Sequence, residues 1–396
     1  MQNNNIIKLL GIQGVSIKNI RNLENSLEVS IETKRKMQQC PSCKCFTNKV
    51  HDYRIQRVQH INISKTLTYL LLKKRRYCCH HCGKKFYESY SFLQKYFRKS
   101  NAVYECVCED LKSLKNFKTI AKDNNISAPT VVRYMHYNFY LSNKHNFNLP
   151  QRIGIDEFKG NCDKEKYQFH IFDLDTRKTI DIVKSRKYDD LEAFFSSFSL
   201  EQRCRVKVVS MDLYSPFKRI IKDKFCHAAI VADTFHYTKL VMQGLDELRI
   251  NLWRNTKGKE KKYFKNLKLT LAKDTSKIKE KEAEKLLYAF EISPILKAAY
   301  QLKQQFLDIK KESSFSEKEK AFRKWLDNAE GSTIKEFKKP VKTLRQWHEY
   351  ISNSFRLNIS NGPVEGKNNM IKTLKRISFG FRNLNNFKER IILCEL

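Results

Sequence analysis

Long apolar runs are missing from this sequence. No stretch approaches the roughly 18 apolar residues needed to span a bilayer, and the N-terminal segment, MQNNNIIKLLGIQGVSIKN, has no basic-then-apolar signal pattern with a cleavage site. These absences predict a cytoplasmic protein with no membrane partner. Disulfides rarely persist in that compartment, so we interpret the 12 cysteines as reduced thiols and metal ligands.

Acidic residues are scarce relative to basic ones. Lys and Arg number 77 against 42 Asp and Glu, which gives a formal net charge of +35. A surplus of this size indicates a polyanionic partner, and nucleic acid is the commonest one. Ribosomal and membrane-surface proteins share the bias, so charge alone does not decide between these classes. The 396 residues suffice for two to four modules, one of which can bury a sizeable core.

Two CxxC pairs flank a strand-like segment, RVQHINISKTLTYLLLKKRRYC. They are Cys40-Pro-Ser-Cys43 and Cys79-His-His-Cys82. Two such knuckles around a β-hairpin provide four thiolates in the tetrahedral arrangement of a zinc ribbon. A redox pair and incidental cysteines are the alternatives. The zinc ion would stiffen a small basic module. Other candidate ligands crowd the site, and a basic run lies alongside it: Cys45, Cys78, His80 and His81, then Lys73, Lys74, Arg75 and Arg76.

The segment FKTIAKDNNISAPTVVRYMHYNF, from Phe117, predicts two helices joined by a short turn. Ser127 can cap the second helix, and its apolar side would pack back on the first through Val131, Val132 and Met135. This pattern is typical of a helix-turn-helix. An ordinary helical hairpin is the alternative, because the turn lacks the glycine often found in the motif. The residues expected to face a DNA major groove are Thr130, Arg133, Tyr134 and His136.

After Pro150 the pattern changes to strands. RIGIDEF, KYQFHIFDLD and TIDIVKSR are β-rich and separated by charged turns, as in a three-stranded meander. A helix follows from about Asp189 to Phe198. The strand VKVVSMD, the helix SPFKRIIKDKF and the strand AAIVAD come next. This order predicts an α/β sheet.

Two of these strands end in an acid. Asp156 ends the apolar part of the first strand, and Asp212 ends VKVVSMD. An acid at the carboxyl end of a core strand lies where α/β sheets place their ligands. The alternative is that each merely caps the turn that follows.

A third acid stands in the stretch SNGPVEGKNN. Pro363 suits a first helical position, with Asn361 or Gly362 before it as a cap, so Glu365 would open a helix. Such a residue can be a favourable charge on the helix dipole, a salt-bridge partner or a metal ligand. Steps of about 100° place Glu365, Asn369, Lys372 and Arg376 on one side and Met370, Leu374 and Ile377 on the core side.

The three acids together suit hard divalent cations. Asp156, Asp212 and Glu365 could hold two Mg²⁺ ions about 4 Å apart, with Mn²⁺ as a substitute. Lys372 and Arg376 would then meet the nucleic-acid backbone.

The motifs in their order resemble the ISL3 family of bacterial insertion-sequence transposases. They are IGIDEF, VVSMD, ADTFHYTKLV and SNGPVEGKNNMIKTLKRISFGFRN, behind a CPSC…CHHC ribbon and a helix-turn-helix, and they span nearly the whole chain. The resemblance implies an RNase H-like catalytic domain with an Asp-Asp-Glu triad, matched by Asp156, Asp212 and Glu365. It also implies an Asp-x-x-His element, matched by Asp233 to His236. Family members are understood to cut element DNA at its 3′ ends with Mg²⁺ and to join those ends to a target.

Between His236 and Glu365 the chain is rich in Lys and Glu with helical periodicity, which predicts a helical insertion rather than a linker. Trp325 and Trp347 are expected in its core. His236 has two interpretations: a contact to a flipped base or phosphate, or a structural histidine. The expected division is 1–95 zinc ribbon, 96–148 helix-turn-helix, 149–236 first part of the RNase H-like core, 237–355 helical insertion, and 356–396 final core helices carrying the glutamate.

The sequence therefore predicts a multidomain α/β DNA transposase of the bacterial cytoplasm, associated with the nucleoid. It would bind double-stranded DNA, both element ends and target, with a structural Zn²⁺ and two Mg²⁺, and would form a dimer or larger assembly on paired ends. The alternatives are a catalytically inactive DNA-binding repressor and an RNase H-like nuclease without strand transfer.

Overall fold

The computed structural model describes residues 7, 9–64, 66–142, 148–359 and 361–395. Its contacts divide the chain into two units: Met1–Asn146 with Thr373–Leu396, and Phe147–Lys372. Each unit is described by itself. Among the described residues, no helix combines the length and the apolarity needed to cross a bilayer.

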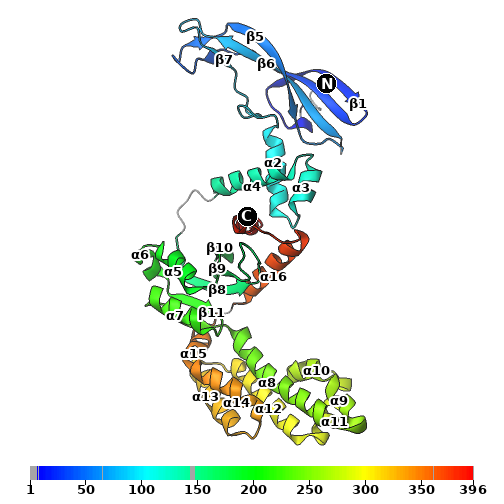
Figure 1. The fold of residues 1–396 in the computed structure, drawn as a ribbon, viewed down its shortest axis with the longest axis vertical. Helices are drawn as coiled ribbons and strands as arrows, with labels where there is room; N and C mark the ends of the chain where they lie inside the picture. The colour runs from blue at the N-terminus through cyan, green and yellow to red at the C-terminus, as the bar shows by residue number, and fades with distance from the viewer. Residues whose placement is uncertain (1–6, 8, 65, 143–147, 360, 396) are drawn as a thin grey trace. The chain divides into compact units, whose positions relative to one another are not determined.

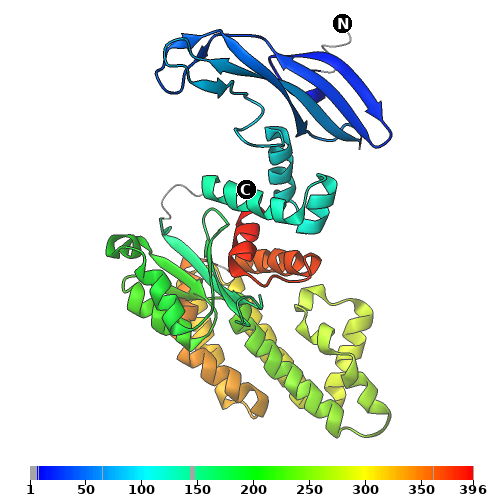
Figure 2. The ribbon, with the colours of Figure 1, turned by 45° about the horizontal axis from the view of Figure 1, so that its top comes forward.

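The first unit contains a five-stranded sheet of order β1-β2-β6-β5, with β7 paired to β6. It is drawn in shades of blue in Figure 2. Alternate side chains of β6 enter its core, where Leu70 and Leu72 are fully buried beside Val58 of β5. The hairpin predicted between the cysteine pairs is confirmed by the antiparallel pairing of β5 and β6. The strands are β1 Val15–Leu23, β2 Ser26–Thr33, β3 Gln38–Gln39, β4 Phe46–Thr47, β5 Val50–Gln59, β6 Leu67–Cys78 and β7 Lys85–Tyr87.

One residue of the predicted basic run is not presented to solvent. Arg75 is 4% exposed, and its guanidinium pairs with Glu32 and Glu88. The register places it on an inner part of the sheet, where a charge needs carboxylate partners.

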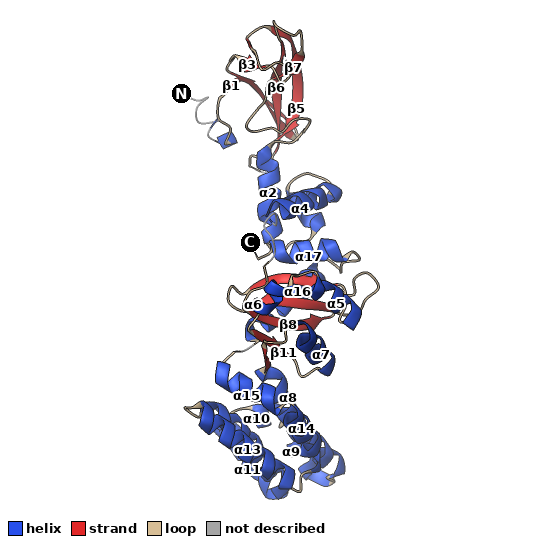
Figure 3. Cartoon of the chain, turned by 90° about the vertical axis from the view of Figure 1, so that its left-hand side faces the viewer, coloured by secondary structure: helices blue, strands red, loops and turns tan. Residues whose placement is uncertain are grey.

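Four helices of the first unit pack together among the described residues. Their shared core contains Val107, Ile120, Val131 and Leu393, which are all fully buried. Figure 3 shows α17 beside α4. The predicted division placed residues 356–396 with the catalytic core, whereas α17 packs against α2 and α4. The helices are α2 Asn101–Lys112, α3 Phe117–Asp123, α4 Ala128–Ser142 and α17 Leu384–Leu393.

Two of the four side chains expected to face DNA from α4 are buried. Thr130 is 7% exposed and Tyr134 9% exposed, so the predicted outward orientation of both is wrong. Thr130 turns back to the Ser127 hydroxyl, and Tyr134 packs edge-to-face on Tyr104 of α2. The buried face of α4 therefore extends one residue further toward the N-terminus than predicted, because α2 also packs against this helix.

The second unit is built on a five-stranded sheet of order β10-β9-β8-β11-β12. β8, β9 and β10 form the predicted antiparallel meander, and β11 runs parallel to both β8 and β12. Figures 1 and 2 show α5 and α7 on one face of this sheet and α16 on the other. The elements are β8 Arg152–Phe158, β9 Gln168–Asp173, β10 Lys178–Val183, α5 Tyr188–Ser196, α6 Leu200–Arg205, β11 Val208–Met211, α7 Ser215–Lys224, β12 Ala229–Ala232 and α16 Gly362–Ile377.

The stretch between β12 and α16 is helical, as predicted (Figure 3). Trp325 and Trp347 are buried in its core, also as predicted. The elements are α8 Thr234–Asn255, η1 Gly258–Glu260, α9 Lys261–Lys265, α10 Lys268–Ala272, η2 Thr275–Lys277, α11 Glu280–Ile292, α12 Pro294–Asp308, η3 Ile309–Lys311, α13 Phe315–Gly331, α14 Lys335–Gln346 and α15 His348–Leu357.

Candidate functional site

Three aspartates meet at one edge of the sheet in the second unit. The parallel register aligns Ser210 with Gly154 and Met211 with Ala232. Extending that register by one or two residues brings Asp212 level with Asp156 on one side and with Asp233 on the other. Sheet topology thus gathers acids that stand well apart in the sequence.

His236 joins this acid cluster from the first turn of α8. Its Nε2 lies 2.9 Å from Asp212 Oδ1 and 3.8 Å from Asp233 Oδ2. The first contact lacks hydrogen-bond geometry, so Asp212 Oδ1 remains buried without a hydrogen-bond partner among the described residues. Asp233 caps α8 by accepting from the Phe235 N–H. A buried acceptor without a donor is costly, and a cation would satisfy it.

The protonation equilibria of the cluster reflect crowded negative charge. Burial, together with the Asp212 carboxylate, raises the pKa of Asp156 to about 7. Burial also raises the pKa of Asp233. Burial opposes protonation of His236, but contacts with Asp212 and the charges of the other two acids raise its pKa overall. At this edge of the sheet, the negative charge of the carboxylates is greater than the positive charge of the neighbouring side chains.

Helix α16 closes over the same face of β8. A Cβ atom on Gly154 would lie 2.9 Å from Val364 Cγ2, so the absence of a side chain there permits the close approach. Val364, Ile371 and Leu374 face inward, whereas Met370 and Ile377, predicted as core residues, are half-buried. The observed core face of α16 is therefore rotated about the helix axis from the predicted one, because the sheet packs against the side on which Asn361 and Val364 lie.

Two asparagines contact the acid cluster, Asn361 just before α16 and Asn368 within it, and Glu365 lies between them along the chain. The Asn361 backbone N–H donates to Asp233 Oδ1 at 3.3 Å. The Asn368 side-chain amide donates to Asp156 Oδ2. Glu365 is exposed and lies about 40° and about 60° around the helix from these two residues, at about 100° per step. Among the described residues, the ligand atoms that come within 4.8 Å of one another here are those of Asp212, Asp233 and His236, so the place of the Glu365 carboxylate in the site stays a prediction.

The sequence analysis gave Asn361 only as a helix cap, and it missed Asn368 and the partner of Asn368, His170. The signal for His170 was present, because a histidine interrupts the apolar run of β9, QFHIFD, in a strand buried on both faces. Its complete burial lowers its pKa to about 4, so the ring is neutral. Nothing in the sequence pattern linked this ring to a helix near the other end of the chain.

The residues of the cluster fit a divalent cation. Asp212, Asp233 and His236 each offer a ligand atom, all within 4.8 Å of one another. Carboxylate oxygens are the ligands that Mg²⁺ prefers, and Asp212 Oδ1, which accepts no hydrogen bond from the described residues, is suited to one.

The four predicted zinc ligands come together in the first unit. The Sγ atoms of Cys40, Cys43, Cys79 and Cys82 lie within 4.8 Å of one another. The Cys40–Cys82 and Cys43–Cys79 sulfurs are 3.5 and 3.4 Å apart, close to the separation of about 3.8 Å that follows from tetrahedral Zn–S bonds of about 2.3 Å. Cys45 and His81 form an overlapping group with Cys43, but only the first group supplies four ligands. The site is that of a structural zinc ion.

Both cysteine knuckles share one backbone design. The residue after each second cysteine has positive φ, 63° at Lys44 and 70° at Gly83. Its N–H donates to the first cysteine's carbonyl, at 3.0 Å to Cys40 and 3.1 Å to Cys79. The left-handed conformation is free for glycine and costs other residues about 1 kcal/mol.

Substitutions at these two positions are expected to have opposite effects. Gly83→Ala should weaken zinc retention by about 1 kcal/mol for backbone reasons alone, because no atom lies within 4 Å of the added Cβ. Lys44→Gly should leave retention unchanged or improve it. The rate of zinc transfer to a chromogenic chelator measures both. Equal rates for Gly83→Ala and the unmodified protein would contradict the explanation.

The other predicted DNA-contact residues are accessible. Arg133, Lys372 and Arg376 are exposed. His136 is exposed as well, but its Nδ1 is 2.5 Å from Glu389 Oε2 of α17.

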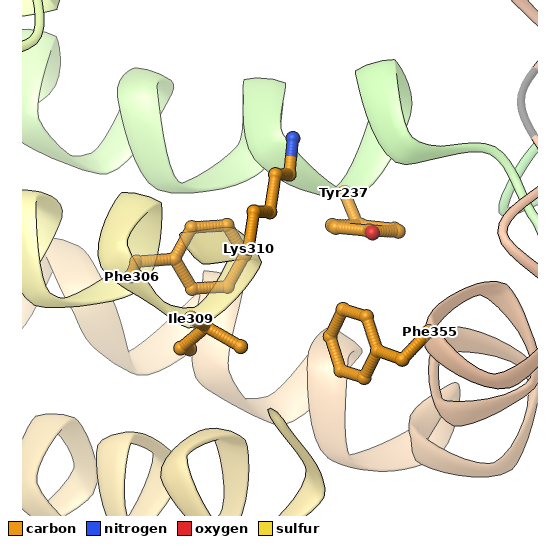
Figure 4. A pocket seen from close by; sticks show the side chains of 5 residues that line it. All are labelled: Tyr237, Phe306, Ile309, Lys310 and Phe355. Atoms are coloured by element: carbon orange, nitrogen blue, oxygen red, sulfur yellow. The ribbon is translucent and has the colours of Figure 1, made fainter. Parts of the chain in front are cut away.

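A hollow with about 150 Å³ of empty space, open solvent included, lies near His236 in the second unit. Figure 4 shows Lys310 reaching toward α8 above the rings of Phe306, Tyr237 and Phe355. Part of that space is open solvent, and the enclosed part is too small for a water molecule. The hollow therefore cannot hold a nucleotide base. Lys310 Nζ donates to Thr238 Oγ1 at 3.2 Å, which fastens the helical stretch to the start of α8.

Comparisons with known proteins agree with this arrangement. A family model described as a transposase of the ISL3 type matches residues 153–391. One described as the zinc-finger of transposase IS204/IS1001/IS1096/IS1165 matches residues 36–82.

Individual relatives point the same way. The chain is 22% identical over 387 residues to the transposase for insertion sequence element IS1001 of Bordetella parapertussis, which covers 95% of this chain and 94% of that protein. It is 23% identical over 256 residues to the transposase for element IS1557 of Mycobacterium tuberculosis, covering 59% and 57%. A Lactococcus lactis protein named an ATP-dependent protease is 37% identical over 101 residues, 26% of this chain and 31% of that protein, a match too short to bear on function. Because the transposase model spans more than half of the chain, the protein belongs to the ISL3 family of insertion-sequence transposases, enzymes that bind and cleave DNA with a divalent metal.

Proposed function

We propose that Asp156, Asp212 and Glu365 are the catalytic triad and hold two Mg²⁺ ions. The observation that carries this proposal is the position of Glu365 between Asn361 and Asn368, both of which contact the acid cluster. When bound, the cations supply Lewis-acid stabilisation of the attacking and leaving oxygens. The chain's own residues orient the DNA strand: Lys372 and Arg376 on the exposed side of α16 would neutralise its phosphates.

The reaction has two steps at one site. Water attacks a phosphodiester at the element end and frees a 3′-hydroxyl. That hydroxyl then attacks a phosphodiester of the target DNA, so one bond forms as another breaks. Positioning and charge neutralisation are what the protein contributes.

We further propose that the second unit is an RNase H-like fold. Support comes from the sheet order β10-β9-β8-β11-β12, with three antiparallel strands followed by two parallel ones. The acids at the ends of β11 and β12, level with Asp156, agree with this assignment.

For α3 and α4 we propose a helix-turn-helix that reads the terminal repeats, with a revised contact face. Pro129, Arg133, His136, Tyr137 and Tyr140 are exposed at the spacing of one helix side. Arg133 is the natural base or phosphate contact, and the two tyrosines would pack along the groove wall. Assembly into a dimer or larger complex, through pairing of two element ends, belongs to this proposal, as does action at the nucleoid in the bacterial cytoplasm.

His236 is proposed to orient Asp212 rather than to contact DNA directly. Its Nε2 lies 2.9 Å from Asp212 Oδ1, and its raised pKa favours the positively charged ring. A bound cation would compete with that charge, so the ring can release the carboxylate when metal binds.

The experiment that tests the function uses labelled element-end DNA with Mg²⁺ and compares the unmodified protein with Glu365→Gln. We expect metal-dependent nicked and joined products from the unmodified protein and a loss of about 100-fold in Glu365→Gln, with end binding retained. Specific binding without cleavage by either protein would indicate a repressor. Nicking without joined products would indicate a nuclease. Unchanged rates in Glu365→Gln would remove it from the triad.

A further inference from the structure

A buried hydrogen-bond chain leads to Asp156 from two neighbouring strands. His170 on β9 is fully buried, and its Nε2 lies 2.9 Å from Thr179 Oγ1 on β10. Its Nδ1 lies 3.0 Å from Asn368 Oδ1 on α16. The Asn368 amide nitrogen in turn donates to Asp156 Oδ2. The chain therefore crosses from the far strand of the meander, through one ring and one amide, to an acid of the cluster.

The direction of every bond in this chain is set at the Asp156 end when that carboxyl is ionised, the form that would bind a metal, because the Thr179 hydroxyl at the other end can donate or accept. A carboxylate only accepts hydrogen bonds, so the Asn368 NH₂ group faces Asp156 and its oxygen faces the ring. The ring must then carry its proton on Nδ1, and Nε2 accepts from the Thr179 hydroxyl. Phe158 and Phe172 lie edge-to-face against the imidazole, at 6.3 and 5.8 Å between ring centroids, and restrain its orientation.

Asp156 is consequently held on both oxygens. Oδ1 accepts from the Glu157 backbone N–H at 2.7 Å, and Oδ2 accepts from Asn368. These two hydrogen bonds fix the directions in which the remaining lone pairs of both oxygens point. Asn368 follows Glu365 by less than one helical turn. The same hydrogen bond therefore also fixes the position along β8 of the part of α16 that carries Glu365.

We infer that Asn368 is a positioning residue that aligns Asp156 with the helix carrying Glu365, and that His170 and Thr179 keep its amide in the required orientation. This inference rests on the proposed function, because it assigns Asn368 to the same metal site. Without the imidazole the amide could flip end for end, which would place its oxygen against the carboxylate. Outer partners of metal ligands typically matter about 10- to 100-fold in metal affinity or activity.

The test measures cleavage of element-end DNA by the full chain over a wide range of Mg²⁺ concentrations. For Asn368→Ala we expect the half-maximal Mg²⁺ concentration to rise about 10- to 100-fold. The maximal rate at saturating Mg²⁺ should recover to within a few-fold, and end-DNA binding should stay unchanged. A residue that merely stabilises the fold would lower the melting temperature without changing the Mg²⁺ requirement, and that result would overturn the inference.

A matched pair at position 170 isolates the role of the imidazole. His170→Asn retains a donor near the Nδ1 position, whereas His170→Leu has a similar volume and no donor. We expect His170→Leu to shift the Mg²⁺ requirement in the same direction as Asn368→Ala, and His170→Asn to restore most of it. Equal requirements in both variants would overturn the orienting role. This pair also decides the matter if Asn368→Ala does not fold.

Asp156→Asn separates failure of the inference from failure of the proposed function. If Asp156→Asn is inactive at every Mg²⁺ concentration while Asn368→Ala behaves as the unmodified protein, only the inference fails. If Asp156→Asn keeps its activity, the proposed metal site itself is wrong.

Discussion

Asp156→Asn is expected to lower metal-dependent cleavage of element-end DNA by about 10³-fold or more. Loss of a central metal ligand removes several kcal/mol of stabilisation of the reacting oxygens, and every increment of about 1.4 kcal/mol corresponds to roughly a factor of ten in rate. Asn368 and the Glu157 N–H would meet an amide in place of a carboxylate, so the site would also lose its alignment. Single-turnover cleavage of labelled DNA measures the loss.

Binding of the element end provides the control. The proposed groove-facing residues, Arg133 among them, belong to the first unit, whereas Asp156 belongs to the second. End-DNA affinity in a mobility-shift assay should therefore change less than about twofold. Cleavage within tenfold of the unmodified rate would contradict the assignment of Asp156.

The same substitution should change how stability depends on pH in metal-free protein. Burial and Asp212 raise the pKa of Asp156 from 3.8 to about 7. The folded state thus binds a proton that the unfolded state releases, so the unfolding free energy falls as pH rises from about 4 to about 7. In Asp156→Asn the unfolding free energy should fall less over this pH range. In the unmodified protein, Mg²⁺ should raise the unfolding free energy more at pH 8 than at pH 5. Thermal melts at both values measure the effect, and a Mg²⁺ response independent of pH would argue against a metal bound to this carboxylate.

Arg390→Leu is expected to destabilise the helices of the first unit by about 3–5 kcal/mol. The side chain is 1% exposed, and its guanidinium donates to three backbone carbonyls at and beyond the end of α2, those of Leu111, Ser113 and Lys115. Removing the guanidinium takes a charged donor from all three carbonyls, and the carbonyl of the fully buried Leu111 then keeps only the weak thiol contact of Cys394. Hydrogen exchange should show reduced protection in α2, α3 and α4, and binding of element-end DNA should weaken by at least tenfold.

Arg382→Leu is the matched control, because Arg382 is exposed nearby on the same C-terminal segment. It should leave protection of these helices unchanged. Arg390→Lys, which keeps the charge but not the planar fork, should fall between the two. Full protection in Arg390→Leu would show that α17 is dispensable to the helices it contacts.

Most strands of the sheet in the second unit could be predicted from the sequence, because the patterns that indicate a strand are local. RIGIDEF coincides with β8, and the acids at strand ends follow from the register of parallel neighbours. The cysteine pairs similarly specify their own site, since four thiolates at that spacing have few other uses. The orientation of α4 was missed for Thr130 and Tyr134, because an isolated helix pattern does not show that two other helices cover it.

The partners of α16 and α17 required the structure. The apolar residues Leu384, Phe387 and Ile391 predict a buried face but do not say against what it packs. Asn368 and His170 are 198 residues apart, and a polar pair at that distance leaves no periodic trace in the sequence.

The placement of α17 has a consequence for the order in which the protein is made. Helices α2 to α4 precede the second unit in the chain, but Leu393 and Arg390, which complete their core and cap α2, are synthesised after it. The complete helical bundle therefore forms only after the whole catalytic unit has been translated. A chain that stops before α17 carries the other three helices without the fourth, and we expect such a product to compete poorly with the full chain for element ends.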